Sequence, residues 1–202
     1  VLQRFLAACA ANPAGCGFGG RNPRRALDRL LARLEREPMP STDPAVPGTL
    51  TAEHVRIGFA KALRRRILWP ILSAGLAQAD AGDPTGLLAF VGSDITPNQN
   101  DDYLTALYAV DQDYPRLPPR AYFKFAERSY ADFRHFWWAS GYPDLAHALW
   151  PVEDRDAYRG PIRNRNATPA LVIGMTHDPA TPYAHAQRLT ADLGNARLLT
   201  FD

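Results

Sequence analysis

The sequence predicts an α/β fold that is mostly helical and ends in a strand–helix–strand unit. Two observations support this prediction. Up to about residue 160, apolar residues recur mainly at helical spacing and do not alternate as in half-buried strands. Residues 170–174 and 196–201 are short apolar runs with a helical pattern between them. Short loops in that order predict a parallel pair of strands, the first of them buried on both faces.

The composition argues against several classes of protein. Hydrophobic residues make up 46% of the 202 residues and charged residues 22%, which is ordinary for a globular protein. The net charge of +2 comes from arginines scattered among acids, so we expect no nucleic-acid partner. Residues 67–77 form the longest apolar stretch, which Pro70 interrupts and which is shorter than the ~20 residues of a membrane span.

The first 48 residues predict two helices and a loop. Residues 1–11 place their apolar side chains on one helical face. Asn22 is a favourable N-cap and Pro23 a favourable first helical residue, so a second helix is expected to start there. Residues 37–48 contain too many prolines for a helix or a central strand and predict a loop or arm.

Residues 51–91 predict three further helices. Thr51 is expected to cap the first, which would run to Ile67 and break before Pro70. The next helix would end at Gly82, where glycine is typical of a helix end. Asp83 would then start the third.

Residues 92–166 are less regular. Residues 92–102 are polar and turn-rich, whereas residues 120–138 predict one long helix. Residues 154–166 are polar and predict an extended segment. The long helix carries an aromatic stripe, which is more often core than a substrate wall: Phe123, Ala126, Tyr130, Phe133 and Trp137.

Asp178 is the candidate functional residue. It follows the strand predicted at residues 170–174, and polar groups just beyond the C-terminal ends of parallel strands line the ligand crevice of α/β sheets. Thr181 as N-cap and Pro182 as first helical residue predict a helix that runs to Gly194. A loop carboxylate at such a place is about as often a simple cap or turn former, so position alone leaves its role open.

Cys9 and Cys16 are the only cysteines. A helix end followed by a turn could bring their sulfurs together, so a local disulfide is geometrically possible. Two buried free thiols agree with the sequence equally well.

Two stretches carry a family resemblance. Residues 168–193, TPALVIGMTHDPATPYAHAQRLTADL, resemble the acid-bearing segment of α/β-hydrolase peptidases of the tripeptidyl aminopeptidase type. The run WPxLxxxLxxAxxGDxxxL within residues 69–88 resembles the cap region of the same family. The resemblance implies a helical cap at residues 1–160 and the C-terminal part of the hydrolase core at residues 161–202. It also implies that Asp178 is the acid of a Ser–Asp–His triad.

The same resemblance favours a disulfide between Cys9 and Cys16, because a cysteine pair at this place is usual in these exported enzymes. An extracellular or cell-envelope location would follow, since disulfides persist in oxidising compartments.

The other members of the triad are not found. A serine hydrolase needs a nucleophile on a strained turn, usually in G-x-S-x-G, and a histidine base. No serine lies in such a turn, and the histidine is expected after the next strand, where the sequence reaches Asp202. We therefore expect an incomplete α/β-hydrolase fold that belongs to a longer enzyme and is inactive by itself. We expect no metal, because the sequence lacks the i, i+4 and C-x-x-C spacings that bring metal ligands together. We expect no cofactor, because it lacks a glycine-rich dinucleotide-binding motif.

The implied activity is an aminopeptidase that releases short N-terminal peptides, with a short peptide or a peptide N-terminus as its substrate. Such an enzyme needs a carboxylate for the substrate ammonium. The candidates, each of a kind that is more often a surface or capping residue, are Asp111, Asp113, Glu127 and Asp132. Two alternatives stay open: another capped α/β-hydrolase (esterase, epoxide hydrolase or dehalogenase), and a non-catalytic helical interaction module. The oligomeric state is not predicted.

Overall fold

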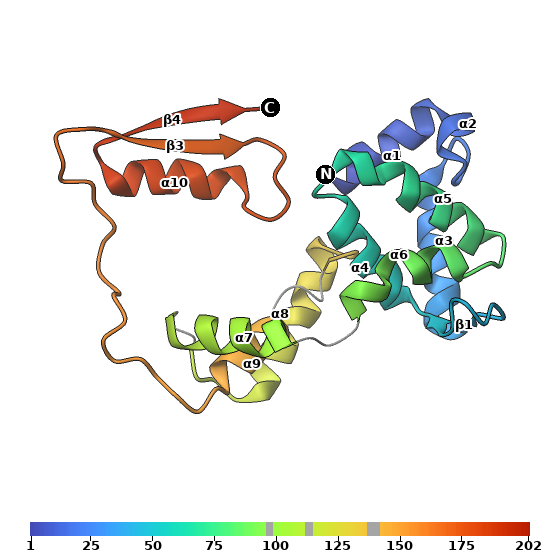
Figure 1. The fold of residues 1–202 in the computed structure, drawn as a ribbon, viewed down its shortest axis with the longest axis horizontal. Coiled ribbons are helices and arrows are strands. Elements are labelled where there is room, and N and C mark those ends of the chain that lie inside the picture. Colours follow the sequence, from blue (N-terminus) through green and yellow to red (C-terminus); the bar gives the residue numbers. More distant parts are fainter. Residues whose placement is uncertain (96–98, 112–114, 137–141) are drawn as a thin grey trace. The chain divides into compact units, whose positions relative to one another are not determined.

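The computed structural model describes residues 1–95, 99–111, 115–136 and 142–202 (Figure 1). The chain divides into two compact units. One comprises Val1–Ile95 with Pro161–Asp202, and the other is Thr96–Gly160. The assignment of residues 1–160 to a cap and of residues 161–202 to a hydrolase core stays a prediction.

The first part of the chain is a helical assembly with a small hairpin. Its elements are α1 (Leu2–Ala11), α2 (Pro13–Cys16), α3 (Pro23–Arg36), β1 (Met39–Pro40), β2 (Thr49–Leu50), α4 (Ala52–Ala62), a 3-10 helix (Arg66–Leu68), α5 (Trp69–Asp80) and α6 (Thr85–Ile95). The Asn22 side chain accepts a hydrogen bond from the Arg25 amide at 3.2 Å and caps α3, as predicted. Thr51 caps α4 in the same way through the His54 amide.

An apolar core holds these helices together. Phe5 of α1 and Phe59 of α4 are fully buried and meet edge to face, with ring centroids 6.3 Å apart. The buried apolar side chains of α5 and α6 include Leu72, Leu76, Leu87 and Val91. The helical spacing that predicted these two helices marks most of their buried faces, but Ile71, which belonged to the predicted spacing of α5, is 52% exposed.

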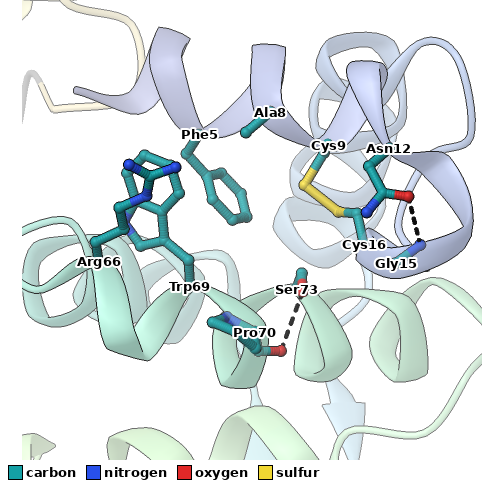
Figure 2. Close-up of a pocket in the computed structure, with 10 residues that line it drawn as sticks. All are labelled: Phe5, Ala8, Cys9, Asn12, Gly15, Cys16, Arg66, Trp69, Pro70 and Ser73. Atoms are coloured by element: carbon teal, nitrogen blue, oxygen red, sulfur yellow. Dashed lines mark hydrogen bonds between the residues drawn. A yellow bond between two sulfur atoms is a disulfide. The ribbon is translucent and has the colours of Figure 1, made fainter.

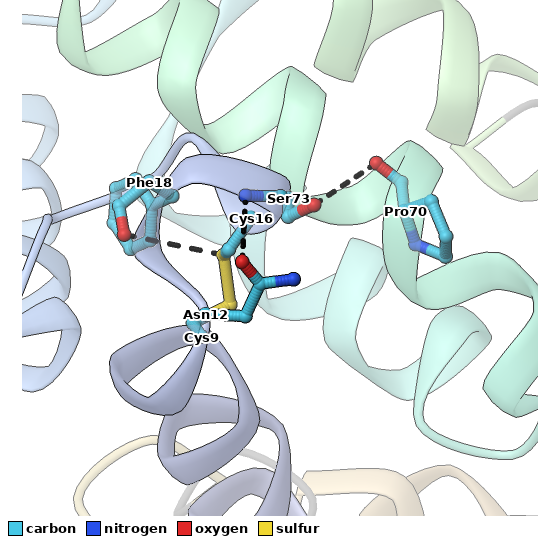
Figure 3. Close-up of a disulfide and its surroundings, with 7 residues drawn as sticks. Cys9, Asn12, Cys16, Phe18, Pro70 and Ser73 are labelled. Carbon is cyan, nitrogen blue, oxygen red and sulfur yellow. Dashed lines mark hydrogen bonds between the residues drawn. A yellow bond between two sulfur atoms is a disulfide. The ribbon is translucent and has the colours of Figure 1, made fainter.

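Cys9 and Cys16 form a disulfide that ties α2 to the end of α1, with Cα atoms 5.0 Å apart (Figure 3). The Asn12 carboxamide oxygen accepts a hydrogen bond from the Gly15 amide at 3.1 Å, which caps the short helix between the cysteines. The structure therefore excludes the alternative of two free thiols.

Two predictions for this part are wrong. Helix α4 ends at Ala62, short of Ile67, and Pro70 lies in the first turn of α5. Proline lacks an amide hydrogen and is tolerated in a first turn, so it can start a helix as readily as end one. Ile67 is 81% exposed, so its apolar character did not indicate a buried helix face. Residues 92–102, predicted as turns, belong largely to helices, because α6 extends to Ile95 and α7 starts at Gln99.

The second unit contains α7 (Gln99–Asp111), α8 (Pro119–Asp132) and α9 (Tyr142–Ala148). Arg116 connects the segment before α8 to the end of α9. Its guanidinium bonds the Glu153 carboxylate at 2.8 Å and the carbonyl oxygens of Ala148 and Trp150 at 3.3 and 3.0 Å. Residues 154–166 contain no helix or strand, but a turn at residues 155–156 interrupts the segment that was predicted to be extended.

The prediction for residues 120–138 is wrong in two respects. Helix α8 ends at Asp132, and Phe123, Tyr130 and Phe133 of the predicted core stripe are exposed. The buried face is the adjacent one, with Tyr122, Ala126 and Ser129. The helical period is the same for both faces, so only the packing partners decide which one is buried. Trp137 lies outside the described residues.

The C-terminal segment is a parallel βαβ unit, as predicted. It consists of β3 (Ala170–Met175), α10 (Tyr183–Leu193) and β4 (Ala196–Phe201). The strands pair in register from Ala170 opposite Ala196 to Met175 opposite Phe201. The helix packs against one face of the pair (Figure 1).

The prediction that β3 is buried on both faces is wrong for this structure. Val172 and Gly174 are buried, whereas Leu171 and Ile173 on the opposite face are 64% and 63% exposed. Gly174 is required for the close packing of α10, because a Cβ at this position would lie 2.7 Å from the Ala186 Cβ and 2.9 Å from the Tyr183 ring.

We expect the disulfide to stabilise the helical part of the chain. For a bridge with a sequence separation of 7, the entropy of closing the loop corresponds to about 2.5 kcal/mol of unfolding free energy. The double variant Cys9→Ser/Cys16→Ser should lose this amount in chemical unfolding. Reductant should destabilise the native protein and leave the double variant unchanged; equal responses of the two proteins would contradict the expectation.

Candidate functional site

Asp178 lies in the loop between β3 and α10, three residues beyond the last residue of the strand. Because β3 and β4 are parallel and in register, this loop lies at the same edge of the sheet as the residue that follows β4, Asp202. The side chain of Asp178 is partly exposed. The structure thus places the predicted residue at the sheet edge where α/β proteins bind ligands.

The Asp178 carboxylate is held by its own loop. Its Oδ1 accepts hydrogen bonds from the amides of Ala180 and Thr181 at 2.8 and 3.0 Å. Its Oδ2 accepts one from the Thr181 hydroxyl at 2.6 Å. A carboxylate has about four acceptor positions. Three are therefore occupied, and Oδ2 can accept one more donor.

These hydrogen bonds explain why the predicted start of α10 is wrong. Thr181 was expected to cap the helix, but its hydroxyl donates to Asp178. The helix begins at Tyr183, with Pro182 at the N-cap position and no side-chain cap. The carboxylate is the stronger acceptor, and a bond to a charged group outweighs a neutral cap.

The same donors keep Asp178 ionised. The Thr181 hydroxyl, followed by the amides of Thr181 and Ala180, holds the pKa of the Asp178 carboxyl below its ordinary value of 3.8. Donors to a carboxylate favour its charged form. Asp178 is therefore an anion at neutral pH, which is the state needed to orient and stabilise an imidazolium.

A second carboxylate, Asp202, lies at the same edge of the sheet. The Thr176 hydroxyl donates to its Oδ1, and His177 Nε2 lies 3.2 Å from the same oxygen. The hydrogen bond from Thr176 and then the charge of His177 lower the pKa of Asp202. His177 therefore pairs with Asp202, although it adjoins Asp178 in the sequence. Parallel strand register was the signal that could have identified Asp202.

The predicted ammonium-binding carboxylates are not brought together. Asp111 is the last residue of α7 and Asp132 the last of α8, and both are exposed, as is Glu127. Asp113 lies outside the described residues. None of the three that the structure describes lines the pockets found in the described parts of the chain.

A pocket formed by α8, α9 and the segment before α8 contains a carboxylate that sequence reasoning missed. It has a volume of about 380 Å³ and combines Asp144 and Arg128 with the apolar side chains of Leu117, Tyr122 and Phe125. Asp144 gives no signal in the sequence, because its place beside α8 depends on tertiary packing.

Another pocket, of about 220 Å³, lies beside the disulfide (Figure 2). Phe5 meets Trp69 edge to face at 5.6 Å, and the Arg66 guanidinium lies 5.6 Å from the Trp69 ring centre. The Ser73 hydroxyl in this pocket donates to the Pro70 carbonyl at 3.0 Å. This serine therefore serves the local backbone, and no histidine lines the pocket to activate it.

The described ranges contain no helix that is both long and apolar enough to cross a bilayer. They also contain no group of three or more histidine, cysteine or acidic side chains placed to hold a metal ion.

Comparison with known proteins identifies related hydrolases. Residues 139–202 match the family model for TAP-like proteins, an α/β-hydrolase family. Carboxylesterase B of Mycobacterium tuberculosis is 29% identical over 219 residues, which cover 100% of this chain and 40% of the relative. Serine protease Hip1 of Mycobacterium bovis is 27% identical over 223 residues, which cover 100% of this chain and 41% of that protein. The chain thus spans about 40% of the length of these relatives.

We expect Thr181→Val to raise the pKa of Asp178 toward 3.8, because the hydroxyl is the main cause of the lowered value. Carboxyl carbon NMR across an acid titration would measure it. Since the folded-state pKa is the lower one, ionised Asp178 stabilises the fold above about pH 4, and this contribution is lost as the pH falls through the folded pKa. Thr181→Val should therefore make the stability of the fold less dependent on pH in this acidic range.

Thr190→Val is the matched control for this titration. Thr190 lies on α10, and its hydroxyl donates to the Ala186 carbonyl, not to a carboxylate. Its loss should leave the Asp178 titration unchanged. An unaltered Asp178 pKa in Thr181→Val would show that the hydroxyl is not the controlling donor.

Proposed function

The chain is a relative of the TAP-like α/β-hydrolases, and we propose that it forms the acid-bearing part of a longer serine hydrolase. In the proposed mechanism, a serine attacks a peptide carbonyl and a histidine takes its proton and returns it to the leaving amine. Asp178 holds the histidine in the correct tautomer and stabilises its charged form. The serine and the histidine would come from parts of the protein outside this chain, which would then be inactive by itself.

The observation that carries the proposal is the state of Asp178. Its carboxylate is ionised and oriented by three donors, and Oδ2 retains one acceptor position. A histidine Nδ1–H arriving from beyond β4 could bond there without displacing an existing partner. An acid that had to break internal bonds to reach the histidine would serve this role less well.

The helical part of the chain would act as a cap. Helices folded over a hydrolase sheet exclude long polypeptides and displace water from the site, which favours short or N-terminal substrates. We therefore propose an aminopeptidase that releases short peptides. The Cys9–Cys16 disulfide supports export to an extracellular or cell-envelope location, where such bonds persist.

An ester hydrolase is the second candidate. It is favoured by the name of the relative carboxylesterase B, which aligns with the whole chain. The same triad cleaves esters and amides, so the distinction depends on how the substrate is bound and not on Asp178.

We expect Asp178→Asn in the complete protein to lower turnover by about 10⁴-fold, as the same change does in serine proteases. The asparagine would present the wrong hydrogen-bonding group to the histidine. Turnover of a peptide amide would be measured beside Asp192→Asn, an exposed aspartate on α10 that should have no effect. Near-normal turnover in Asp178→Asn would remove this residue from the mechanism.

Substrate assays of the complete protein separate the two candidates. An aminopeptidase should cleave tripeptidyl amides with a free amino group and lose most activity when that group is acetylated, because the ammonium needs a carboxylate partner. Activity on simple esters alone would favour the esterase. Equal Michaelis constants for free and acetylated peptides would contradict an ammonium-binding pocket.

A further inference from the structure

We propose that the pocket between α8 and α9 binds a short zwitterionic peptide, with Asp144 accepting the ammonium group and Arg128 binding the carboxylate. The inference depends on the proposed function only for the choice of a peptide as the ligand. It names a binding site and a ligand class, and it requires no particular position of the pocket relative to Asp178.

The two charged side chains of this pocket have no partner among the residues that the structure describes. Asp144 is half-buried in the first turn of α9, and Arg128 is exposed on α8. Both line the same pocket, yet neither forms an ion pair or a side-chain hydrogen bond in the part of the chain that the structure describes. Partial burial of an unpaired carboxylate is unfavourable, so Asp144 would gain from a cationic ligand.

The remaining walls are apolar. Phe125 is 54% exposed, and Leu117 is 50% exposed. The Tyr122 hydroxyl donates to the Pro115 carbonyl, so this residue offers its ring and not an unpaired polar group to the pocket. A volume of about 380 Å³ is near the small end of ligand pockets, which suits a short peptide with an apolar side chain.

The walls are also held in place before any ligand arrives. Leu117 adjoins Arg116, whose guanidinium bonds the Ala148 carbonyl at the end of α9 and the Glu153 carboxylate. This connection fixes the segment before α8 against the helix that carries Asp144. A preorganised pocket binds its ligand with a smaller loss of conformational entropy.

The pair of opposite charges selects the ligand class. A simple anion would be repelled by Asp144, and a simple cation by Arg128. A neutral apolar ligand would leave both charges without a partner and further desolvated. A peptide with free amino and carboxyl groups satisfies both, and its side chain can cover the exposed apolar walls.

Calorimetric titration of the complete protein carrying Asp178→Asn tests the proposal. The ligands are the tripeptide Ala-Ala-Phe, its N-acetyl derivative and its C-terminal amide. We expect the free tripeptide to bind best, with each blocked form weaker by roughly 10-fold or more, since each loses one charged hydrogen bond. Equal affinities for the three ligands would overturn the proposal.

Variants of Asp144 and Arg128 test which of the two residues binds each end of the peptide. Asp144→Asn should weaken the free tripeptide by roughly 10-fold and abolish its advantage over the acetylated form. Arg128→Gln should abolish its advantage over the amide. The controls are Asp192→Asn on α10 and Arg120→Gln on α8, which change exposed residues outside the pocket and should bind as the parent does. Equal losses in the controls would overturn the assignment.

The outcomes separate this proposal from the triad. Near-normal hydrolysis by the Asp178→Asn protein would remove Asp178 from the mechanism, and the affinity ratios would still decide on the pocket. An inactive Asp178→Asn protein whose tripeptide affinity does not change with Asp144→Asn would overturn the pocket and leave the triad intact.

Discussion

The hydrogen bonding of Asp178 by its own loop is the constraint on which the site depends. Without the donors from Ala180 and Thr181, a partly exposed carboxylate on a loop would rotate freely and would be solvated on both oxygens. With them it has one orientation, a lowered pKa and a single open acceptor position. The β3–β4 register adds the second condition, because it brings the end of β4, from which the histidine would come, to the same edge of the sheet.

Sequence reasoning succeeded where the signal was local. The strands β3 and β4, the cap at Asn22 and the place of Asp178 follow from residues next to one another in the chain. It failed where two local signals compete or where packing decides. Thr181 can cap a helix or donate to a carboxylate, and the structure shows the second. The buried face of α8 depends on its neighbours, which the helical period does not identify.

The βαβ unit has one covered face and one open face, and this asymmetry has a physical meaning. The register places Ile173 beside Leu199 and Met175 beside Phe201, all of them exposed, so the open face is a continuous apolar surface. Parallel sheets are normally covered on both sides, and both edges of a two-stranded sheet carry unpaired backbone groups. These features support the proposal that the unit is one part of a larger hydrolase core. They also explain why an apolar run typical of a doubly buried strand has one exposed face in this structure.

The carboxylates of Asp178 and Asp144 differ in their hydrogen bonding, and this difference suggests different roles. An acid that positions a catalytic base must have its orientation before the substrate binds, so its partners have to be internal; Asp178 has three such partners. An acid that binds a ligand must keep its acceptor positions open until the ligand supplies the donors, and Asp144 has no partner among the described residues. An unpaired Asp144 carboxylate destabilises the free protein, and a bound ligand that donates to it would remove this destabilisation. If both proposals hold, the hydrogen bonding of each carboxylate, more than its place in the sequence, distinguishes a positioning acid from a binding acid in this chain.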